Sequence, residues 1–524
     1  MEKNAINPIT RLDYPDADVI RVNDTYYMVS TTMHFMPGCE ILRSYDLVNW
    51  EHATYVYDYL DSTPAQTLTG DESIYGKGMW AASIRYHKGL FYVCFVANDT
   101  GKTYLYTCDS IYGSWKKSII EGFYHDCSLL FDDDDRVYIV YGNKHIYLTE
   151  LKSDLSGPLE GGLHRMVVSD EGNPSLGYEG AHFYKIKGKY YLFFIHSLRD
   201  RWMRTEACFM SDSLEGEFIG GDVLVDHRGY CNQGVAQGGI VDTPEGNWYA
   251  ILFQDHGAVG RIPVLLPVSW QGDWPVFGLD GHIPEIFPLP SSRPDYSYES
   301  LVNSDDFKAS SLLSSPEDKV KYGCFGLKSM WQFNHEPDLS LVHRDTANGV
   351  LWIETGKLCQ NPVMARNMLT QRMLFPGCSG EVTVDVSHLK EGDYAGLCAL
   401  QGCYGMIAVT KRNGQNYIVM QNREAKDNSL FAPPKDLSAG KEWESVFTNE
   451  DKITLKISVD FWHMKDEAEF FYLCQGEWKK IGPTHKLYFK MDHFTGCRFG
   501  LFTYATKETG GKAGFLNFVY NKLI

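Results

Sequence analysis

A hairpin pattern recurs along the first half of the chain, and residues 178–194 show it most plainly. Each copy reads as a polar residue, a strand, a tight turn and a returning strand rich in aromatic residues, which predicts an antiparallel β-hairpin. Further copies span 16–29, 80–95, 126–141 and 237–253. A repeat of roughly fifty to sixty residues with hairpin content is typical of a β-propeller, so five copies predict five blades.

One position is shared by all five copies. When the copies are aligned on the aromatic residue after the turn, the residue 11 or 12 positions earlier is Asp16, Trp80, Asp126, Glu179 or Gln237. Equal offsets in equivalent hairpins imply equivalent places in space, so these residues should ring one mouth of the central channel, a concave site. A single acid at a strand start is commonly an ordinary turn residue, but three carboxylates with one shared offset favour a functional role.

The pattern changes after a stretch rich in proline and serine at 284–294, which indicates a linker. Beyond it apolar residues alternate cleanly, as in Val382, Val384 and Val386, and the sequence Arg412-Asn413-Gly414 separates two such runs as a hairpin turn. We therefore predict an all-β chain, with a five-bladed β-propeller over residues 1–294 and a β-sandwich of the jelly-roll, lectin-like kind over residues 295–524.

Composition narrows the class of partner and the compartment. A formal charge of −18 and the lack of a basic stripe exclude nucleic acid as the expected partner and favour a neutral or cationic ligand. The first residues hold no apolar signal core and no run is long enough to span a membrane, so we expect no membrane association. The 13 cysteines lack metal-binding spacing, which indicates reduced thiols in a cytoplasmic protein. A homo-oligomer is compatible with the sequence, which does not fix the oligomeric state.

Two Asp and one Glu from different blades suit hydrolysis of a glycosidic bond. That reaction needs one protonated acid for the leaving oxygen and one carboxylate on the opposite face of the sugar. A third carboxylate beside the acid raises its pKa, so that its proton remains available near neutral pH. Position on a ring does not by itself assign these roles. A protein that only binds carbohydrate is the alternative of another class, but binding alone does not require an acid, a base and a tuning group.

Four motifs in chain order carry a resemblance to a known family: YPDAD at 14–18, WAASIRY at 80–86, HDCSLLF at 125–131 and YEGAH at 178–182. Over the whole chain the sequence resembles glycoside hydrolase family 43 and the β-sandwich appended to its β-xylosidases. The resemblance implies an inverting enzyme with Asp16 as general base, Asp126 as pKa modulator and Glu179 as general acid. An inverting site should separate base and acid by roughly 6.5–9.5 Å to admit a water.

The resemblance also implies weaker assignments. Trp80 and Phe35 would form walls of the sugar subsite, and Arg261 would donate to sugar hydroxyls, although it could also hold Asp126 ionised. A lone His such as His256 is usually a satisfied core residue; several family members instead hold a Ca²⁺-type cation in the channel through a His, and His256 would be that ligand here. Gln237 stands where many relatives have His, which puts a His-mediated metal site on that blade in doubt.

The activity that the resemblance implies is that of a β-D-xylosidase releasing xylose from the non-reducing ends of short xylo-oligosaccharides. The closest rival is an α-L-arabinofuranosidase, which uses the same three carboxylates, and one active site could perform both reactions. An exo-acting enzyme needs a closed pocket. The Phe35 loop and a sandwich loop near 502–511 could build it, in which case the sandwich would serve as a docked lid.

Overall fold

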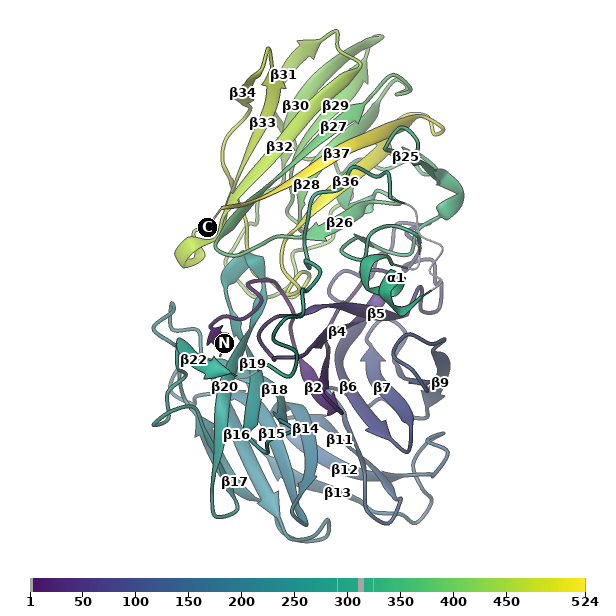
Figure 1. The fold of residues 1–524 in the computed structure, drawn as a ribbon. Helices are drawn as coiled ribbons and strands as arrows, with labels where there is room; N and C mark the ends of the chain where they lie inside the picture. The colour runs from purple at the N-terminus through teal and green to yellow at the C-terminus, as the bar shows by residue number, and fades with distance from the viewer. Residues whose placement is uncertain (1–2, 290, 310–314, 324, 524) are drawn as a thin grey trace.

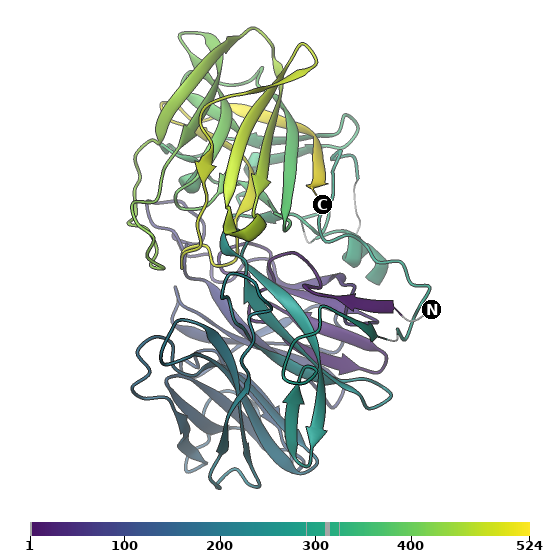
Figure 2. The same ribbon diagram turned by 90° about the vertical axis from the view of Figure 1, so that its left-hand side faces the viewer.

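The structure is a computed structural model that describes residues 3–289, 291–309, 315–323 and 325–523. It confirms the predicted fold class: a five-bladed β-propeller carries a β-sandwich on one end (Figure 1). In the view turned by 90°, the green and yellow sandwich sheets again stand on the purple and teal propeller (Figure 2). In the described part of the chain, no helix is long and apolar enough to cross a membrane.

Each blade is a four-stranded antiparallel sheet made of consecutive strands. In chain order the blades are β2 (Asp18–Val22), β3 (Thr25–Val29), β4 (Gly38–Ser44) and β5 (Glu51–Tyr57); β6 (Met79–His87), β7 (Leu90–Ala97), β8 (Lys102–Cys108) and β9 (Lys116–Ile120); β10 (Ser128–Phe131), β11 (Val137–Asn143), β12 (His145–Leu151) and β13 (His164–Ser169); β14 (Glu179–Ile186), β15 (Lys189–Ser197), β16 (Arg204–Ser211) and β17 (Ile219–Leu224); and β18 (Val235–Asp242), β19 (Trp248–Asp255), β20 (Arg261–Gln271) and β21 (Trp274–Phe277).

Apolar residues fill the seams between neighbouring blades. Both faces of a middle strand are buried, as in β15, which explains why the returning strand of each repeat is continuously apolar rather than alternating. No strand is exchanged between the first and last blades. Instead, the seam between blades five and one is continuous with the core of the sandwich, and β1 (Lys3–Ile6) pairs with β22 (Ile286–Leu289) beside it.

One largely enclosed guanidinium ties four blades together inside the channel. Arg85 of β6 donates to the Asp18 carboxylate at 2.6 Å, to the Ser128 hydroxyl at 2.6 Å and to the Leu129 carbonyl at 2.7 Å. It also donates to the Phe183 carbonyl at 3.3 Å. These partners belong to blades one, three and four, so one side chain sets the spacing of the innermost strands and fills the channel between them.

The sandwich consists of two facing antiparallel sheets of seven and eight strands. The first holds, in spatial order, β23 (Gln332–Phe333), β26 (Leu369–Arg372), β36 (Arg498–Ala505), β28 (Asp393–Leu400), β29 (Gly405–Arg412), β30 (Gln415–Asn422) and β31 (Lys441–Thr448). The second holds β24 (Val342–Asp345), β25 (Val350–Glu354), β37 (Lys512–Leu523), β27 (Gly377–Asp385), β32 (Lys452–Asp460), β33 (Glu467–Cys474) and β34 (Glu477–Lys480), with β35 (His485–Lys486) paired to β33.

The sequence patterns of the sandwich have the expected structural meaning. Alternate residues of β32 are buried, with Leu455 and Ile457 fully inside, so the alternating run is a strand with one face in the core. Asn413 and Gly414 both have positive φ, of 52° and 76°, as the two-residue turn between β29 and β30 requires.

A long irregular segment connects the domains. It includes the short helix α1 (Pro316–Lys321), which begins at a capping Ser315, and the predicted division at residue 294 lies within it. Single-turn 3-10 helices occur at η1 (Gly257–Val259), η2 (Leu339–Leu341), η3 (Pro362–Met364) and η4 (Trp462–Met464).

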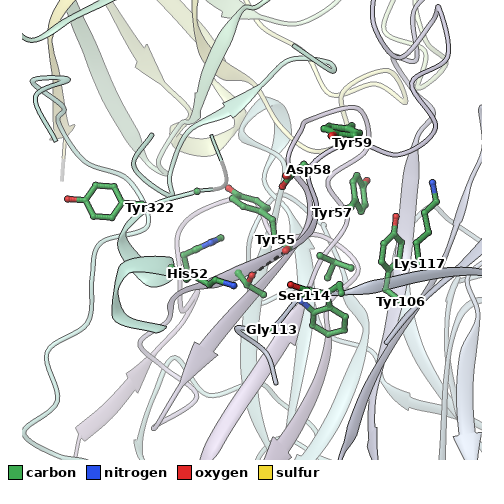
Figure 3. Close-up of a pocket in the computed structure, with 15 residues that line it drawn as sticks. His52, Tyr55, Tyr57, Asp58, Tyr59, Tyr106, Gly113, Ser114, Lys117 and Tyr322 are labelled. Atoms are coloured by element: carbon green, nitrogen blue, oxygen red, sulfur yellow. Dashed lines mark hydrogen bonds between the residues drawn. The ribbon is translucent and has the colours of Figure 1, made fainter. Parts of the chain in front are cut away.

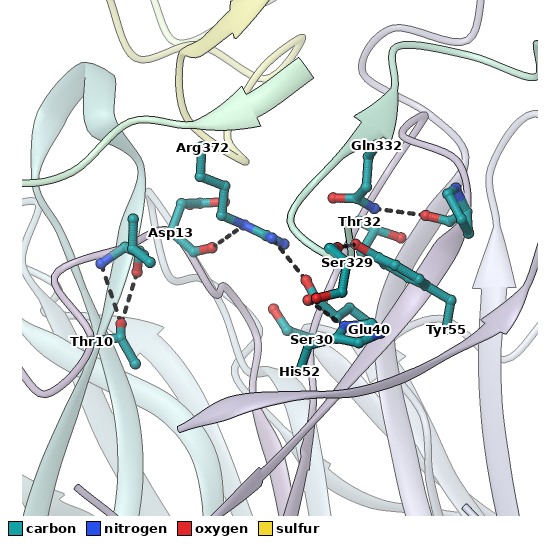
Figure 4. A network of polar contacts seen from close by, with 12 residues as sticks. Thr10, Asp13, Ser30, Thr32, Glu40, His52, Tyr55, Ser329, Gln332 and Arg372 are labelled. Carbon is teal, nitrogen blue, oxygen red and sulfur yellow. Dashed lines mark hydrogen bonds and ion pairs between the residues drawn. The ribbon is translucent and has the colours of Figure 1, made fainter. Parts of the chain in front are cut away.

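The domains meet through a buried ion network (Figure 4). Arg372 of the sandwich donates to the Asp13 carbonyl at 3.0 Å and to the Glu40 carboxylate at 2.7 Å, and His52 lies 2.9 Å from the other Glu40 oxygen. Burial opposes ionisation of Glu40, but the Arg372 charge and the His52 hydrogen bond outweigh it and hold its pKa at about 2. The interface is thus fixed by fully desolvated charges that satisfy one another.

We predict that Arg372→Met strongly destabilises the protein, because it leaves the Glu40 carboxylate buried without its cation. Breaking a buried pair by removing one partner costs about 3–5 kcal/mol. Urea unfolding measures the loss. Lys435→Met is the matched control, since Lys435 also pairs across the interface, with Glu72 at 2.6 Å, but in an exposed position. It should cost less than about 1 kcal/mol. Equal losses in the two variants would contradict the role given to the buried network.

Candidate active site

The residues at the shared repeat position do converge at one mouth of the propeller. Innermost strands β2, β6, β10, β14 and β18 pack against one another in a closed ring. Asp16 and Asp126 each lie two residues before their strand, Glu179 is the first residue of β14, and Trp80 and Gln237 lie near the starts of β6 and β18. The structure therefore brings together the three carboxylates that the offset selected.

The backbone is irregular where these side chains leave it. Asp16, Asp126 and Gln237 have positive φ of 55°, 48° and 57°, and in blade four the neighbouring Gly180 takes this conformation with φ of 67°. The pairing register shifts beside Trp80, Glu179 and Gln237. Such bulges re-aim side chains at the end of a strand and recur next to functional sites. Here the irregular starts separate the mouth residues from the regular strands that follow them.

Asp16 is held at the bottom of the site. It is 4% exposed and accepts hydrogen bonds from Thr31 Oγ1 at 2.6 Å and Arg261 Nη1 at 2.7 Å. The backbone N–H of Arg261 donates to Asp13 Oδ1 at 2.7 Å, which links Asp16 to the interdomain network. Arg261 forms an ion pair with Asp16, the ordinary structural role that an arginine at this position can have. Its charge also lowers the pKa of Asp126, as one of the two predicted roles requires, and the predicted substrate contact stays a prediction.

Asp126 and Glu179 form a second cluster with His125. His125 Nε2 lies 3.7 Å from Asp126 Oδ2 and 3.9 Å from Glu179 Oε2, and Asn143 donates to Glu179. The Glu179 side chain is 19% exposed and that of Asp126 8%, so the cluster opens towards solvent at Glu179. His125 and Asn143 were not selected from the sequence, although His125 stands inside one of the quoted motifs.

The electrostatics of this cluster favour a retained proton. Burial raises the pKa of Asp126 to about 7; the His125 charge lowers it in part, and the charges of Glu179 and Asp16 add to the rise. The charge of Asp126 in turn raises the pKa of His125 to about 9, against the opposing effect of burial, with Glu179 contributing. Near neutral pH the cluster can therefore both keep and release a proton.

Trp80 lines the site, and a buried ring of the sandwich, Phe494, supports it from behind. Trp80 lies at the mouth, with its ring centroid 5.2 Å from that of Phe494 of the sandwich in an edge-on arrangement. Phe494 also covers the Arg261 guanidinium, 4.4 Å from its ring centroid. The sandwich therefore contributes to the site through the segment between β35 and β36. The expected loop near 502–511 does not, because Phe502 lies within β36 and is fully buried in the sandwich.

Phe35 is placed away from the mouth. It is fully buried at the domain interface, where the Arg498 guanidinium lies 3.4 Å from its ring centroid and His34 packs beside it at 4.2 Å. It belongs to an apolar cluster made largely of sandwich residues. Phe35 therefore joins the domains in this structure and does not line the sugar pocket, because no face of its ring is left for a ligand.

The surroundings of His256 do not fit a hydrated cation. Both ring nitrogens are buried without hydrogen-bond partners in the described part of the chain, which by itself would suit a ligand. However, the ring lies between Tyr230 at 4.2 Å and Phe375 at 4.6 Å, and burial together with the Arg228 charge lowers its pKa to about 3. The predicted cation would take its other oxygen ligands from water, and His256, 2% exposed between these rings, meets almost no solvent-accessible space for them.

In the described part of the chain, the one group of His, Cys, Asp and Glu side chains close enough to share a metal ion is His125, Asp126 and Glu179, with ligand atoms within 4.8 Å of one another. This is the proton-holding cluster itself. A separate cavity of about 440 Å³, lined by tyrosines such as Tyr57 and Tyr106, lies between the outer strands of blades one and two and the segment after α1 (Figure 3). Its lining includes none of the mouth residues.

We predict that Asp126→Asn changes the pH dependence of stability. A folded pKa of about 7, above the ordinary 3.8, means that the folded state binds this proton more tightly than the unfolded state. The resulting stability is complete below pH 3.8 and is lost as the pH rises towards 7; the raised pKa of His125 acts in the same direction at higher pH.

Between pH 5 and pH 8 the wild type should therefore lose roughly 2–3 kcal/mol more stability than Asp126→Asn. Urea unfolding at both pH values measures this difference. Asp134→Asn, at the exposed tip of the β10–β11 hairpin, should follow the wild type. If the free energy of unfolding of Asp126→Asn falls as much as that of the wild type between pH 5 and pH 8, ionisation of the buried Asp126 does not destabilise the protein and the prediction is wrong.

Comparisons with known proteins agree with this architecture. The model of glycosyl hydrolases family 43 matches residues 5–275, and that of the beta xylosidase C-terminal Concanavalin A-like domain matches residues 326–521. A beta-xylosidase of Formosa agariphila is 25% identical over 567 residues, covering 97% of this chain and 88% of that protein. A non-reducing end alpha-L-arabinofuranosidase of Bacteroides ovatus is 26% identical over 482 residues, covering 87% and 85%.

Among solved structures, a bifunctional GH43-CE protein of Bacteroides eggerthii superposes with a TM-score of 0.89 at 41% identity. The match covers 100% of this chain but only 64% of that one, so this chain spans less than two thirds of its length. The family model alone accounts for more than half of the chain, over the five blades that carry the three carboxylates. The protein is therefore a glycoside hydrolase and belongs to family 43.

Proposed function

We propose that the protein is an inverting, exo-acting β-D-xylosidase that releases xylose from the non-reducing ends of short xylo-oligosaccharides. Asp16 is the general base, Glu179 the general acid and Asp126 the modulator of the acid. The observation that carries the proposal is the contrast between the two carboxylate environments: Asp16 accepts two hydrogen bonds at the buried end, whereas Glu179 shares a proton-holding cluster at the exposed end.

The depth of the groups supports exo action. A terminal sugar that enters the mouth would place its anomeric carbon between Asp16 and Glu179, with its ring against Trp80. Asp16 would accept a proton from a water that attacks the anomeric carbon, and Glu179 would donate a proton to the departing oxygen. Arg261 and Thr31 orient Asp16 for this role, and His125 and Asp126 lie beside Glu179.

An α-L-arabinofuranosidase, or an enzyme with both activities, is the second candidate, and the Bacteroides ovatus relative favours it. The two sugars place their reacting bonds alike, so the same carboxylates serve both. A protein that only binds carbohydrate is disfavoured by family membership and by the intact trio of carboxylates.

Cytoplasmic location stays a proposal, supported by the free thiol state of every cysteine in the described part of the chain. A homo-oligomer stays a prediction, whereas a cation held by His256 is not proposed, because the surroundings of that ring do not fit one.

We predict that Asp16→Ala and Glu179→Ala differ in their dependence on the leaving group. Each should lower kcat on an unactivated aryl β-D-xyloside by about 10²–10⁴-fold, as expected for removal of a general acid or base. With a strongly acidic phenol as leaving group, Glu179→Ala should recover most of its rate, because that phenol departs without a proton. Asp16→Ala should not recover.

The matching aryl α-L-arabinofuranosides, assayed in parallel, rank the two sugars, and Asp134→Ala serves as the control for an exposed carboxylate. Proton NMR of the first sugar released from a β-xyloside should show the α-anomer, as inversion requires. First release of the β-anomer would refute the inverting mechanism, and the lack of turnover of either sugar would refute the proposed substrate class.

A further inference from the structure

A cavity of about 940 Å³ lies where the rim of blades four and five faces the sandwich. Trp202 and Arg204 of blade four and Asp255 of blade five form its propeller wall. The opposite wall comes from sandwich residues within 424–430, 464–466 and 486–490, including Asp466 and Phe489. None of the three carboxylates of the mouth lines this cavity, so it is a space distinct from the catalytic pocket.

The cavity nevertheless shares a wall with the catalytic pocket. Asp255, which lines it, lies with Oδ1 3.5 Å from Arg261 Nε, and Arg261 holds Asp16. Phe489, which also lines it, has its ring centroid 6.0 Å from the Arg261 guanidinium carbon. A ligand in the cavity would therefore lie one side chain away from the residues that hold the general base.

The cavity lies at the same end of blade four as the general acid. Across blade four, Glu179 pairs with Ile195 and Arg204 pairs with Ser197, two residues along the same strand β15. Arg204 and Glu179 are therefore at the same end of one blade, and Trp202 precedes β16 at that end. The acid must contact the leaving oxygen, so the part of the substrate beyond the cleaved bond begins at Glu179 and extends over the rim of this blade.

The lining is suited to a sugar. Trp202 is 40% exposed and offers an aromatic face at the rim. Arg204 is 6% exposed and uses Nε on Asp255 at 2.8 Å, while its terminal nitrogens have no hydrogen-bond partner in the described part of the chain. Asp466 is likewise 6% exposed, and its Oδ1 has none there either. A buried acceptor such as Asp466 Oδ1 is normally satisfied, so it points to a polar ligand, and the terminal nitrogens of Arg204 are further donors in the lining of the same cavity.

We propose that this interdomain cavity binds the sugar units of the leaving group, and that Trp202, Arg204 and Asp466 make the enzyme select oligosaccharides over glycosides with a short leaving group. The inference rests on the proposed function for its choice of ligand, a neutral xylo-oligosaccharide. Trp202 would stack on the face of one sugar ring, while Arg204 and Asp466 would donate to and accept from its hydroxyl groups.

The first test compares xylotriose with an aryl β-D-xyloside. Trp202→Ala should lower kcat/KM for xylotriose by about tenfold, the value of one aromatic stacking contact, and should lower it by a clearly smaller factor for the aryl xyloside. Asp466→Asn, which preserves shape, should change the ratio of the two substrates in the same direction. Trp478→Ala removes a tryptophan of similar exposure, 36%, from the edge strand β34 and should leave the ratio unchanged. Equal factors for both substrates would overturn the proposal.

The second test separates this inference from the proposed function. In the Glu179→Gln background, calorimetry measures binding of xylotriose and of xylose without turnover. Adding Trp202→Ala should weaken xylotriose binding by about tenfold and leave xylose binding unchanged. If the wild type hydrolyses neither the aryl β-D-xyloside nor the aryl α-L-arabinofuranoside while Trp202→Ala still weakens xylotriose binding alone, the proposed function fails, but the inference that the cavity binds sugar is retained. If xylotriose binds no more tightly than xylose, the cavity takes no leaving-group sugar and the inference fails.

Discussion

The guanidinium of Arg85 is the constraint on which the arrangement of the site depends. It bonds to Asp18, two residues after Asp16, and to Ser128, two residues after Asp126. It also reaches the Phe183 carbonyl, four residues after Glu179. A planar group with donors in a fixed fork imposes its own geometry on its partners. One side chain in the channel therefore fixes the positions of all three carboxylates relative to one another, although the described blades share no strand.

What the sequence could predict follows from the range of the interactions involved. The offset rule found Asp16, Asp126 and Glu179 because hairpin periodicity is local, and equivalent hairpins in a ring must begin at equivalent places. The offset rule did not identify His125, because the direction of a side chain at an irregular strand start depends on the local bulge and not on periodicity. The propeller and the sandwich were predictable for the same reason that the carboxylates were.

Errors arose where the answer depends on how the two domains meet. Phe35 was placed in the sugar pocket, but Arg498 and the sandwich core cover its ring. Phe494, which packs behind Trp80 and Arg261, stands in a segment without alternation between β35 and β36. No pattern in the sequence distinguishes such a segment from an ordinary loop, because its role is set by contacts with residues hundreds of positions away. The sandwich consequently supports the pocket, through Phe494 and Arg372.

The filled channel has a consequence for the order of events in a catalytic cycle. Since Arg85, Asp18 and Ser128 occupy the space between the innermost strands, the pocket is closed at its base. Under the proposed function, a released monosaccharide beside Asp16 would therefore have one route out, and that route would be occupied until the rest of the substrate had departed past Glu179. Departure becomes sequential, with the remaining oligosaccharide first and the single sugar second, and accumulated monosaccharide should compete directly with the next chain end for the emptied pocket.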